Sequence, residues 1–187
     1  MIKKAIFLDR DGTINYPALN RKTGEFEAPH SPEVLKLYEC SILSLKKLQS
    51  MGYLLFLVSN QPDFVKRKCT LQDLSEVHNR FHDILVENNI KFKDYYYCFH
   101  HPSVSSCFCR KPSPFLIKRA EDIFKLNLKE SWMVGDRETD VLCGKNAGTK
   151  TIKIGNKKSI LSDFTATDIK EAAEIIEFCD RINKKEN

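Results

Sequence analysis

Three short apolar runs in this 187-residue chain each lead into polar residues of the kinds that bind metal ions or phosphate. Residues 5–8 run into Asp9-Arg10-Asp11-Gly12-Thr13, residues 53–58 into Ser59-Asn60-Gln61, and residues 132–134 into Gly135-Asp136. If these runs are parallel strands, their carboxyl ends share one edge of a sheet, which is where open α/β sheets bind ligands. The sequence therefore predicts one site built from three distant segments.

The carboxylates of that predicted site indicate a cation. Asp9, Asp11 and Asp136 would repel one another in a shared crevice unless a cation or a proton intervened. Oxygen ligands suit Mg²⁺, which keeps coordination positions for water and a substrate phosphate. Asp-Gly is also a common turn and aspartate often caps helices, so the first motif alone could be structural. Its place after a buried run, matched by Ser59 and Asp136 after two others, favours a Mg²⁺ site.

Seven cysteines and two neighbouring histidines suggest a second metal site. The count is odd and we expect no secretory leader, which disfavours a disulfide framework. Cys98, His100, Cys107 and Cys109 are the ligand set of a closed tetrahedral zinc site. In extended segments the two intervening phenylalanines would point away from the ligands. The alternatives are small buried hydrophobes or a redox pair. The spacing favours His100 over His101, and we expect the other four cysteines to be ordinary thiols.

The composition is that of a globular domain. The hydrophobic fraction is 42% and the charged fraction 29%, which excludes a disordered chain. Since the apolar runs are far shorter than the roughly 20 residues of a membrane helix, we expect no membrane partner and a cytoplasmic location. The net charge of +5 is too modest to indicate nucleic acid. We expect residues 1–187 to form one domain and the protein to be a monomer.

The pattern along the chain predicts α/β architecture. Apolar runs bounded by turn residues alternate with segments of helical periodicity, which indicates a Rossmann-like parallel sheet with helices on both faces. A capping box of Thr70 and Asp73 marks one helix start, and Gly52 marks one helix end. Residues 14–33 should form an irregular flap of about 20 residues, a length typical of functional loops. The predicted strands are 5–8, 53–58, 95–99, 132–134 and 149–154, and the predicted helices are 42–51, 70–89, 112–126 and 168–183.

Four motifs in this order resemble those of the haloacid dehalogenase-like (HAD) phosphohydrolases. They are Asp9-x-Asp11-Gly12-Thr13, Ser59-Asn60, Lys111-Pro112 and Gly135-Asp136-x-x-x-Asp140. Any one of these motifs is weak evidence, whereas four in order are strong.

The HAD resemblance assigns roles to these residues. It implies that Asp9 is the nucleophile and that Asp11 is the general acid and base. Mg²⁺ would be held by Asp9, Asp136 and the backbone carbonyl of Asp11. Ser59, the backbone N–H of Asn60 and Lys111 would hold the phosphoryl oxygens. Asp140 would fix Lys111 or the surroundings of the metal.

The cysteine segment resembles a narrower branch of that family. Cys-x-His-His-Pro followed by Cys-x-Cys-Arg-Lys-Pro is similar to the D-glycero-D-manno-heptose 1,7-bisphosphate 7-phosphatases and the related histidinol-phosphate phosphatases. These enzymes lack a large cap domain and have a zinc-stapled loop, here 98–109. The resemblance implies that Arg110 binds a second phosphate, while Arg137 either does the same or is a surface arginine. Segments 15–30 and 62–68 depart from the branch pattern.

The leading hypothesis is a Mg²⁺-dependent phosphomonoesterase that forms an aspartyl phosphate on a small phosphorylated metabolite. A heptose bisphosphate is favoured over histidinol phosphate as the substrate. The run Lys66-Arg67-Lys68 motivates a polynucleotide 3′-phosphatase as an alternative, although a zinc loop argues for small substrates. A non-catalytic, zinc-stabilised binding module is a further alternative, and it is disfavoured because every catalytic position carries a suitable residue type.

Overall fold

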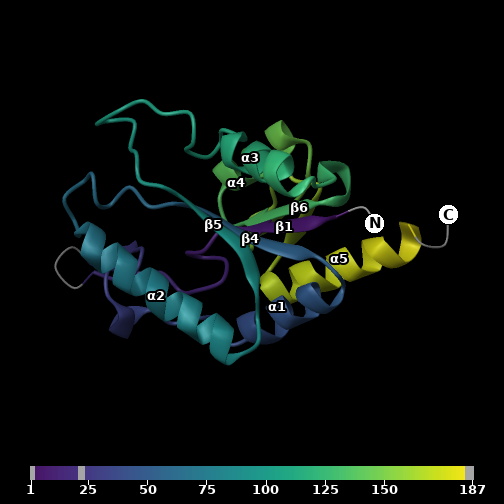
Figure 1. Ribbon diagram of the computed structural model, residues 1–187, viewed down its shortest axis with the longest axis horizontal. Coiled ribbons are helices and arrows are strands. Elements are labelled where there is room, and N and C mark those ends of the chain that lie inside the picture. The colour runs from purple at the N-terminus through teal and green to yellow at the C-terminus, as the bar shows by residue number, and fades with distance from the viewer. Residues whose placement is uncertain (1–2, 21–23, 184–187) are drawn as a thin grey trace.

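One six-stranded parallel sheet forms the centre of the molecule (Figure 1). The computed structural model describes residues 3–20 and 24–183. The strand order is β5-β4-β1-β6-β7-β8, and each neighbouring pair is parallel. This arrangement confirms the predicted α/β sheet. The strands are β1 Ala5–Leu8, β4 Leu54–Asn60, β5 Phe92–Cys98, β6 Trp132–Gly135, β7 Lys150–Ile154 and β8 Phe164–Ala166.

Helices cover both faces of the sheet, as predicted. One apolar core packs α1, α2 and α5 against one face, and a second packs α3 and α4 against the other. Strand β1 lies between the two cores, and all four of its side chains have no solvent exposure. A strand covered on both faces needs a continuous apolar sequence, which explains Ala-Ile-Phe-Leu. The helices are α1 Ser41–Ser50, α2 Leu71–Glu87, α3 Phe115–Phe124, α4 Glu138–Ala147 and α5 Ile169–Asn183.

Helix α2 begins where its sequence predicts. The Oγ1 atom of Thr70 accepts a hydrogen bond from the Asp73 backbone N–H at 3.1 Å. The Asp73 carboxylate in turn accepts from the Thr70 N–H at 2.7 Å, which completes the capping box. Because α2 repeats apolar side chains every three or four residues, its buried residues fall on one face. They are Leu74, Val77, Phe81 and Leu85.

Several features differ from the predicted elements. Strand β5 begins at Phe92 and not at residue 95. Helix α4 was not expected, because its buried side includes Asp140 and Gly144 and so lacks a clear apolar period. The three-residue edge strand β8 was not expected either. Helix α3 begins at Phe115 and not at residue 112, because the chain first passes through a turn that holds two prolines.

The flap, residues 14–33, is more regular than predicted. Strand β2, Ala18–Leu19, pairs antiparallel with β3, Phe26–Glu27. A single 3₁₀ turn, η1 at Pro32–Val34, follows. Residues 21–23 lie outside the described part of the chain. This two-stranded hairpin is inserted between β1 and α1, and it agrees with the expectation of a fold without a large cap.

No helix in the described ranges has both the length and the apolar character needed to cross a bilayer.

Candidate active site

The carboxyl ends of β1, β4 and β6 meet at one cavity of about 500 Å³. Leu8 is in register with Leu57 on one side and Val134 on the other, so the residues that follow these strands are neighbours. The structure brings every predicted Mg²⁺- or phosphate-binding residue to the walls of this cavity. They are Asp9, Asp11, Ser59, Asn60, Arg110, Lys111, Asp136, Arg137 and Asp140.

The Lys111 ammonium lies at the floor of the cavity between two carboxylates. Its Nζ atom is 2.8 Å from Asp9 Oδ1 and 2.7 Å from Asp140 Oδ1, and it donates to the Val58 carbonyl at 2.7 Å. Burial favours the neutral amine, but the charges of Asp140 and Asp9 outweigh it and raise the pKa of Lys111 above its ordinary value. Lys111 is therefore a fixed cation that lies between two carboxylates and a backbone carbonyl.

The Asn60 side chain fixes the backbone of Lys111. Its Nδ2 donates to the Lys111 carbonyl at 3.2 Å, and its Oδ1 accepts from the Lys111 N–H at 3.1 Å. This paired contact ties the end of β4 to a segment 51 residues later in the chain. Sequence reasoning assigned only the backbone N–H of Asn60, and no spacing signal pointed to the side-chain amide.

Three carboxylates form a cluster suited to a hard cation. Oxygen atoms of Asp9, Asp136 and Asp140 all lie within 4.8 Å of one another. The Oδ1 atom of Asp136 is buried and has no hydrogen-bond partner among the described residues. Burial, followed by repulsion from Asp9 and Asp140, raises the pKa of Asp136 to about 7. An oxygen-only donor set with an unpartnered buried atom fits Mg²⁺.

Gly12 allows the chain to approach this cluster closely. Its φ of +82° is in the left-handed region that glycine favours. A Cβ atom at this position would lie 2.5 Å from Asp136 Oδ2. The Asp-Gly turn is therefore part of the crevice and not a remote turn.

The carboxylate of Asp11 is held away from the cluster by four hydrogen bonds. Its Oδ1 accepts from Arg10 Nε at 3.1 Å and from Asn15 Nδ2 at 3.0 Å. Its Oδ2 accepts from Arg10 Nη2 at 3.2 Å and from Gln61 Nε2 at 2.6 Å. Burial opposes ionisation, but the Arg10 charge and these donors prevail, so the pKa of Asp11 lies below its ordinary value.

The residues that hold Asp11 were missed by sequence reasoning. Arg10 and Gln61 stand inside the quoted motifs, and Arg10 is only 1% exposed. A buried arginine next to an aspartate is a signal that could have been used, since arginine is rarely buried without a partner. Asn15 gave no such signal.

Ser59, Arg110 and Arg137 differ in how firmly they are placed. Ser59 is 1% exposed, and its Oγ accepts from Gln61 Nε2 at 3.1 Å. Arg110 is partly exposed and donates from Nη1 to the His100 carbonyl at 3.0 Å. Arg137 is exposed at the start of α4, where its backbone N–H donates to Asp140 Oδ2 at 2.9 Å.

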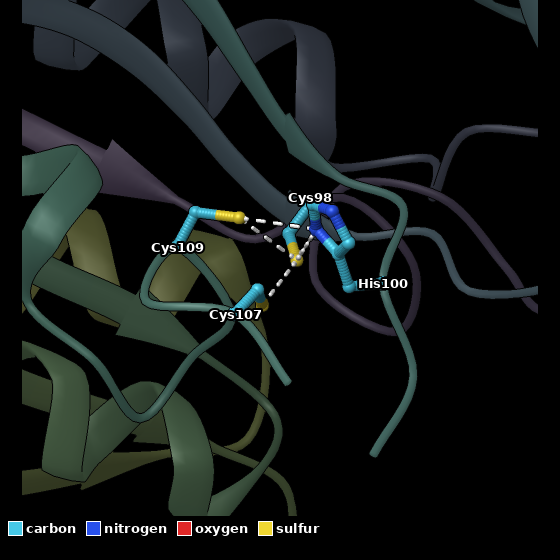
Figure 2. Close-up of side chains that lie close together, drawn as sticks. All are labelled: Cys98, His100, Cys107 and Cys109. Carbon is cyan, nitrogen blue, oxygen red and sulfur yellow. Dashed lines mark hydrogen bonds between the residues drawn. The ribbon is translucent and has the colours of Figure 1, made fainter. Parts of the chain in front are cut away.

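Cys98, His100, Cys107 and Cys109 point toward one common centre (Figure 2). The Cys98 sulfur is 3.8 Å from that of Cys107 and 3.3 Å from that of Cys109. His100 Nδ1 lies 3.7 Å from the Cys98 sulfur and 3.4 Å from the Cys109 sulfur. Four ligands at the zinc–sulfur distance of about 2.3 Å stand roughly 3.8 Å apart at the corners of a tetrahedron. The donor set and its spacing therefore fit Zn²⁺.

His101 is not directed to this cluster. Its Nδ1 lies 2.6 Å from the Ser103 hydroxyl instead. The described structure contains no disulfide, and all seven cysteines are free thiols.

Comparison with known proteins places the chain in a family. It is 32% identical over 168 residues to the D-glycero-beta-D-manno-heptose-1,7-bisphosphate 7-phosphatase of Pasteurella multocida, a match that covers 87% of each chain. The chain belongs to the HAD-like phosphatase family. A family model described as HAD-hydrolase-like also matches residues 108–173 of this HAD protein.

Two further matches are a solved structure with a similar fold and a second curated relative. The crystal structure of D,D-heptose 1,7-bisphosphate phosphatase from B. bronchiseptica, complexed with magnesium and phosphate, superposes with a TM-score of 0.79. The sequence identity is 20%, and the match covers 94% of this chain and 98% of that one. The histidine biosynthesis bifunctional protein HisB of Campylobacter jejuni is 28% identical over 88% of this chain and 47% of its own length.

Proposed function

We propose that this HAD phosphatase is a Mg²⁺-dependent phosphomonoesterase that removes the 7-phosphate of a D-glycero-D-manno-heptose 1,7-bisphosphate. The observation that carries the proposal is the buried Asp9, bound by Lys111 and facing two further carboxylates at the floor of the cavity. The relative in Pasteurella multocida carries this activity in its name, which supports the choice of substrate.

Asp9 is the proposed nucleophile. Lys111 binds its Oδ1, so Oδ2 is the oxygen that attacks phosphorus. The new bond joins Asp9 to the phosphoryl group, and the bond from phosphorus to the sugar oxygen breaks. Ser59 and Lys111 line the same cavity as Asp9, and they are the proposed groups that stabilise the charge on the transferred group.

The carboxylates of Asp9 and Asp136, with the backbone carbonyl of Asp11, would hold Mg²⁺. When bound, the cation supplies positive charge between an anionic nucleophile and an anionic phosphate. Asp140 would serve chiefly to fix Lys111, because its Oδ1 contacts the ammonium at 2.7 Å.

Asp11 is the proposed proton carrier. In the first half-reaction it gives a proton to the departing sugar oxygen, and in the second it takes one from the water that attacks the aspartyl phosphate. The four hydrogen bonds to Asp11 suit the ionised form that acts as base. To act as acid, Asp11 has to give up at least one of these donors, since a protonated carboxyl must itself donate.

The zinc cluster would fix the residues beside the phosphate. Cys109 is followed directly by Arg110 and Lys111, so a metal at the cluster holds the start of the segment that reaches the substrate. A loop of this size has no core of its own, and a structural zinc supplies the missing constraint. Because free cysteines are typical of reducing compartments, we propose a cytoplasmic location.

The cavity favours a small substrate over a polynucleotide. Within the run Lys66-Arg67-Lys68, Lys68 forms an ion pair with Glu27 and is not available to a nucleic-acid backbone. Only Lys66 and Lys68 of the three line the cavity. The run 66–68 therefore does not offer a polynucleotide three free, neighbouring cations.

A phosphate-release assay tests the proposal. Wild-type enzyme and Asp9→Asn would be supplied with the heptose bisphosphate or with histidinol phosphate, with and without Mg²⁺. We expect Mg²⁺-dependent release from the heptose, and a loss of at least about 10³-fold in Asp9→Asn. Asp122→Asn, an exposed charge change on α3, serves as the control. Equal turnover by wild type and Asp9→Asn, or a preference for histidinol phosphate, would contradict the proposal.

A further inference from the structure

A second cavity shares a wall with the surroundings of Asp11. Its volume is about 280 Å³, and Arg10 and Gln61, two of the three residues that donate to Asp11, line it. Neither Asp9 nor Asp11 lines this cavity. The rest of its wall is mostly aromatic and apolar and comes chiefly from α2 and β5. Side chains outside the active-site cavity therefore contact the groups that hold Asp11.

The sheet brings Tyr97 of β5 to Arg10. Tyr97 pairs in register with Ser59 at the end of β4, and β1, which Arg10 follows, lies on the other side of β4. The side chains of Tyr97 and Arg10 share a hydrogen bond, and both line the second cavity. Arg10 is 1% exposed, so the N–H groups that do not reach Asp11 need partners inside the protein. The Tyr97 oxygen is one such partner.

His78 orients the Tyr97 hydroxyl. Its Nδ1 atom, on α2, lies 3.0 Å from the Tyr97 oxygen. Burial, followed by the charges of His82 and Arg10, lowers the pKa of His78, so the imidazole is neutral at pH 7. A neutral imidazole can accept at Nδ1, whereas the Arg10 guanidinium can only donate. The Tyr97 O–H therefore donates to His78, and its oxygen accepts from Arg10.

These contacts form a continuous chain from α2 to Asp11. Arg10 completes it by donating to the two carboxylate oxygens of Asp11 at 3.1 Å and 3.2 Å. The long arginine side chain has many rotamers, and each hydrogen bond at its far end restricts them. A contact that fixes the guanidinium therefore also fixes the direction in which it holds the Asp11 carboxylate.

We propose that Tyr97, oriented by His78, is a positioning residue that acts on Asp11 through Arg10. This inference rests on the proposed role of Asp11 and extends it to two residues that do not line the active-site cavity. Because Asp11 moves protons and does not bind the phosphate, the two residues contribute to kcat and not to substrate binding.

Tyr95 offers a matched control. It stands two residues before Tyr97 on the same strand, and it also lines the second cavity. Its hydroxyl makes the same kind of contact, at 3.0 Å from Nδ1 of the exposed His82. Tyr95→Phe therefore removes a contact between a hydroxyl and a histidine while leaving the contact between Tyr97 and Arg10 in place.

The kinetic test measures kcat and KM on the heptose 1,7-bisphosphate. We expect Tyr97→Phe to lower kcat about fivefold with little change in KM, and Tyr95→Phe to change neither. In an Arg10→Gln background, Tyr97→Phe should have no further effect, because the residue through which it acts is gone. His78→Leu should lower kcat as Tyr97→Phe does, and His78→Asn, whose Oδ1 can accept in place of Nδ1, should restore most of it. Equal losses in Tyr97→Phe and Tyr95→Phe, or additive losses with Arg10→Gln, would overturn the inference.

A measurement without turnover separates this inference from the proposed function. Hydrogen exchange of the Arg10 Nε–H, followed by NMR and assigned by the signal that Arg10→Gln lacks, reports how firmly the guanidinium is held. Exchange about fivefold faster in Tyr97→Phe than in wild type and Tyr95→Phe supports the positioning role even if the heptose is not the substrate. Unchanged exchange in Tyr97→Phe would overturn that role even if the enzyme hydrolyses the heptose.

Discussion

Replacing Asp136 with asparagine should make the magnesium-free protein more stable while removing its response to Mg²⁺. Without the cation and above pH 7, Asp136 is an ionised group held near Asp9 and Asp140 in a buried crevice. Asparagine keeps the shape of the side chain and removes the repulsion. At residue 136, asparagine therefore favours the stability of the fold, whereas aspartate favours the binding of Mg²⁺.

The size of the effect follows from the pKa of Asp136, which is about 7 in the folded protein against an ordinary value of 3.8. The difference is about three pH units, and each unit corresponds to about 1.4 kcal/mol. Above pH 7, where Asp136 is ionised in both states, the folded protein is thus destabilised by about 4 kcal/mol. Because a buried asparagine amide also needs hydrogen bonds, we expect Asp136→Asn to raise the free energy of unfolding by about 2–4 kcal/mol at pH 8.

The pH dependence has a definite sign. Between pH 3.8 and about 7 the unfolded state ionises Asp136 while the folded state keeps it protonated. The contribution of Asp136 to stability is present below this window, falls as the pH rises through it, and is lost above it. The pKa of Asp9 is also raised, chiefly by burial. Because Asp9 and Asp136 repel each other, the difference between wild type and Asp136→Asn reports the loss of the Asp136 charge together with its effect on Asp9. This difference should grow from pH 4 to pH 7.

Urea unfolding followed by tryptophan fluorescence measures this directly. Trp132 is the single tryptophan, and it is 1% exposed in β6. The zinc-loaded proteins would be compared with and without Mg²⁺. Saturating Mg²⁺, at 100 times its Kd, should stabilise wild type by about 2.7 kcal/mol and leave Asp136→Asn unchanged. Asp122→Asn should differ from wild type by less than about 0.5 kcal/mol. An Asp136→Asn protein that is no more stable than wild type at pH 8 without Mg²⁺ would refute the reasoning.

Three further predictions follow from the site. Removing zinc should speed hydrogen exchange in loop 98–109 and raise KM about tenfold or more. Hydrogen exchange in the central sheet should not change. Full activity after complete zinc removal would contradict this prediction. Arg10→Gln removes two hydrogen bonds to Asp11, so kcat should fall about tenfold with little change in KM, and Arg10→Lys should not restore it because lysine lacks the paired donors. Asn60→Ala leaves the Lys111 backbone groups unpaired, which should cost about 1–3 kcal/mol of stability by urea unfolding, and Asn60→Asp, which cannot donate to the carbonyl, should recover only part of it.

The sheet and the composition of the crevice could be predicted because they rest on local patterns. A strand buried on both faces must be apolar throughout, and polar residues directly after it must lie at the carboxyl edge, so Asp9, Ser59 and Asp136 were brought together correctly. The grouping of Cys98, His100, Cys107 and Cys109 could also be predicted, since alternation in an extended segment places Cys98 and His100 on one side.

The contacts that organise these groups could not be predicted in the same way. The amide of Asn60 pairs with a backbone 51 residues away, and Gln61 reaches a carboxylate 50 residues away. Such contacts depend on side-chain direction in the folded state, which no sequence period encodes. Helix α4 was not predicted from the sequence for a related reason. It packs through Gly144 and the buried Asp140, and it has little apolar periodicity.

The cysteines at 98, 107 and 109 lie close to Lys111 in the sequence, which makes the enzyme sensitive to oxidation. The sulfurs of Cys98 and Cys109 lie 3.3 Å apart, and a two-electron oxidant such as peroxide would join them as a disulfide and remove two metal ligands. Cys109 stands two residues before Lys111, which contacts Asp9, the proposed nucleophile. Peroxide would thereby inhibit a phosphatase whose reacting groups contain no sulfur, and a thiol reductant with added zinc would reverse the damage.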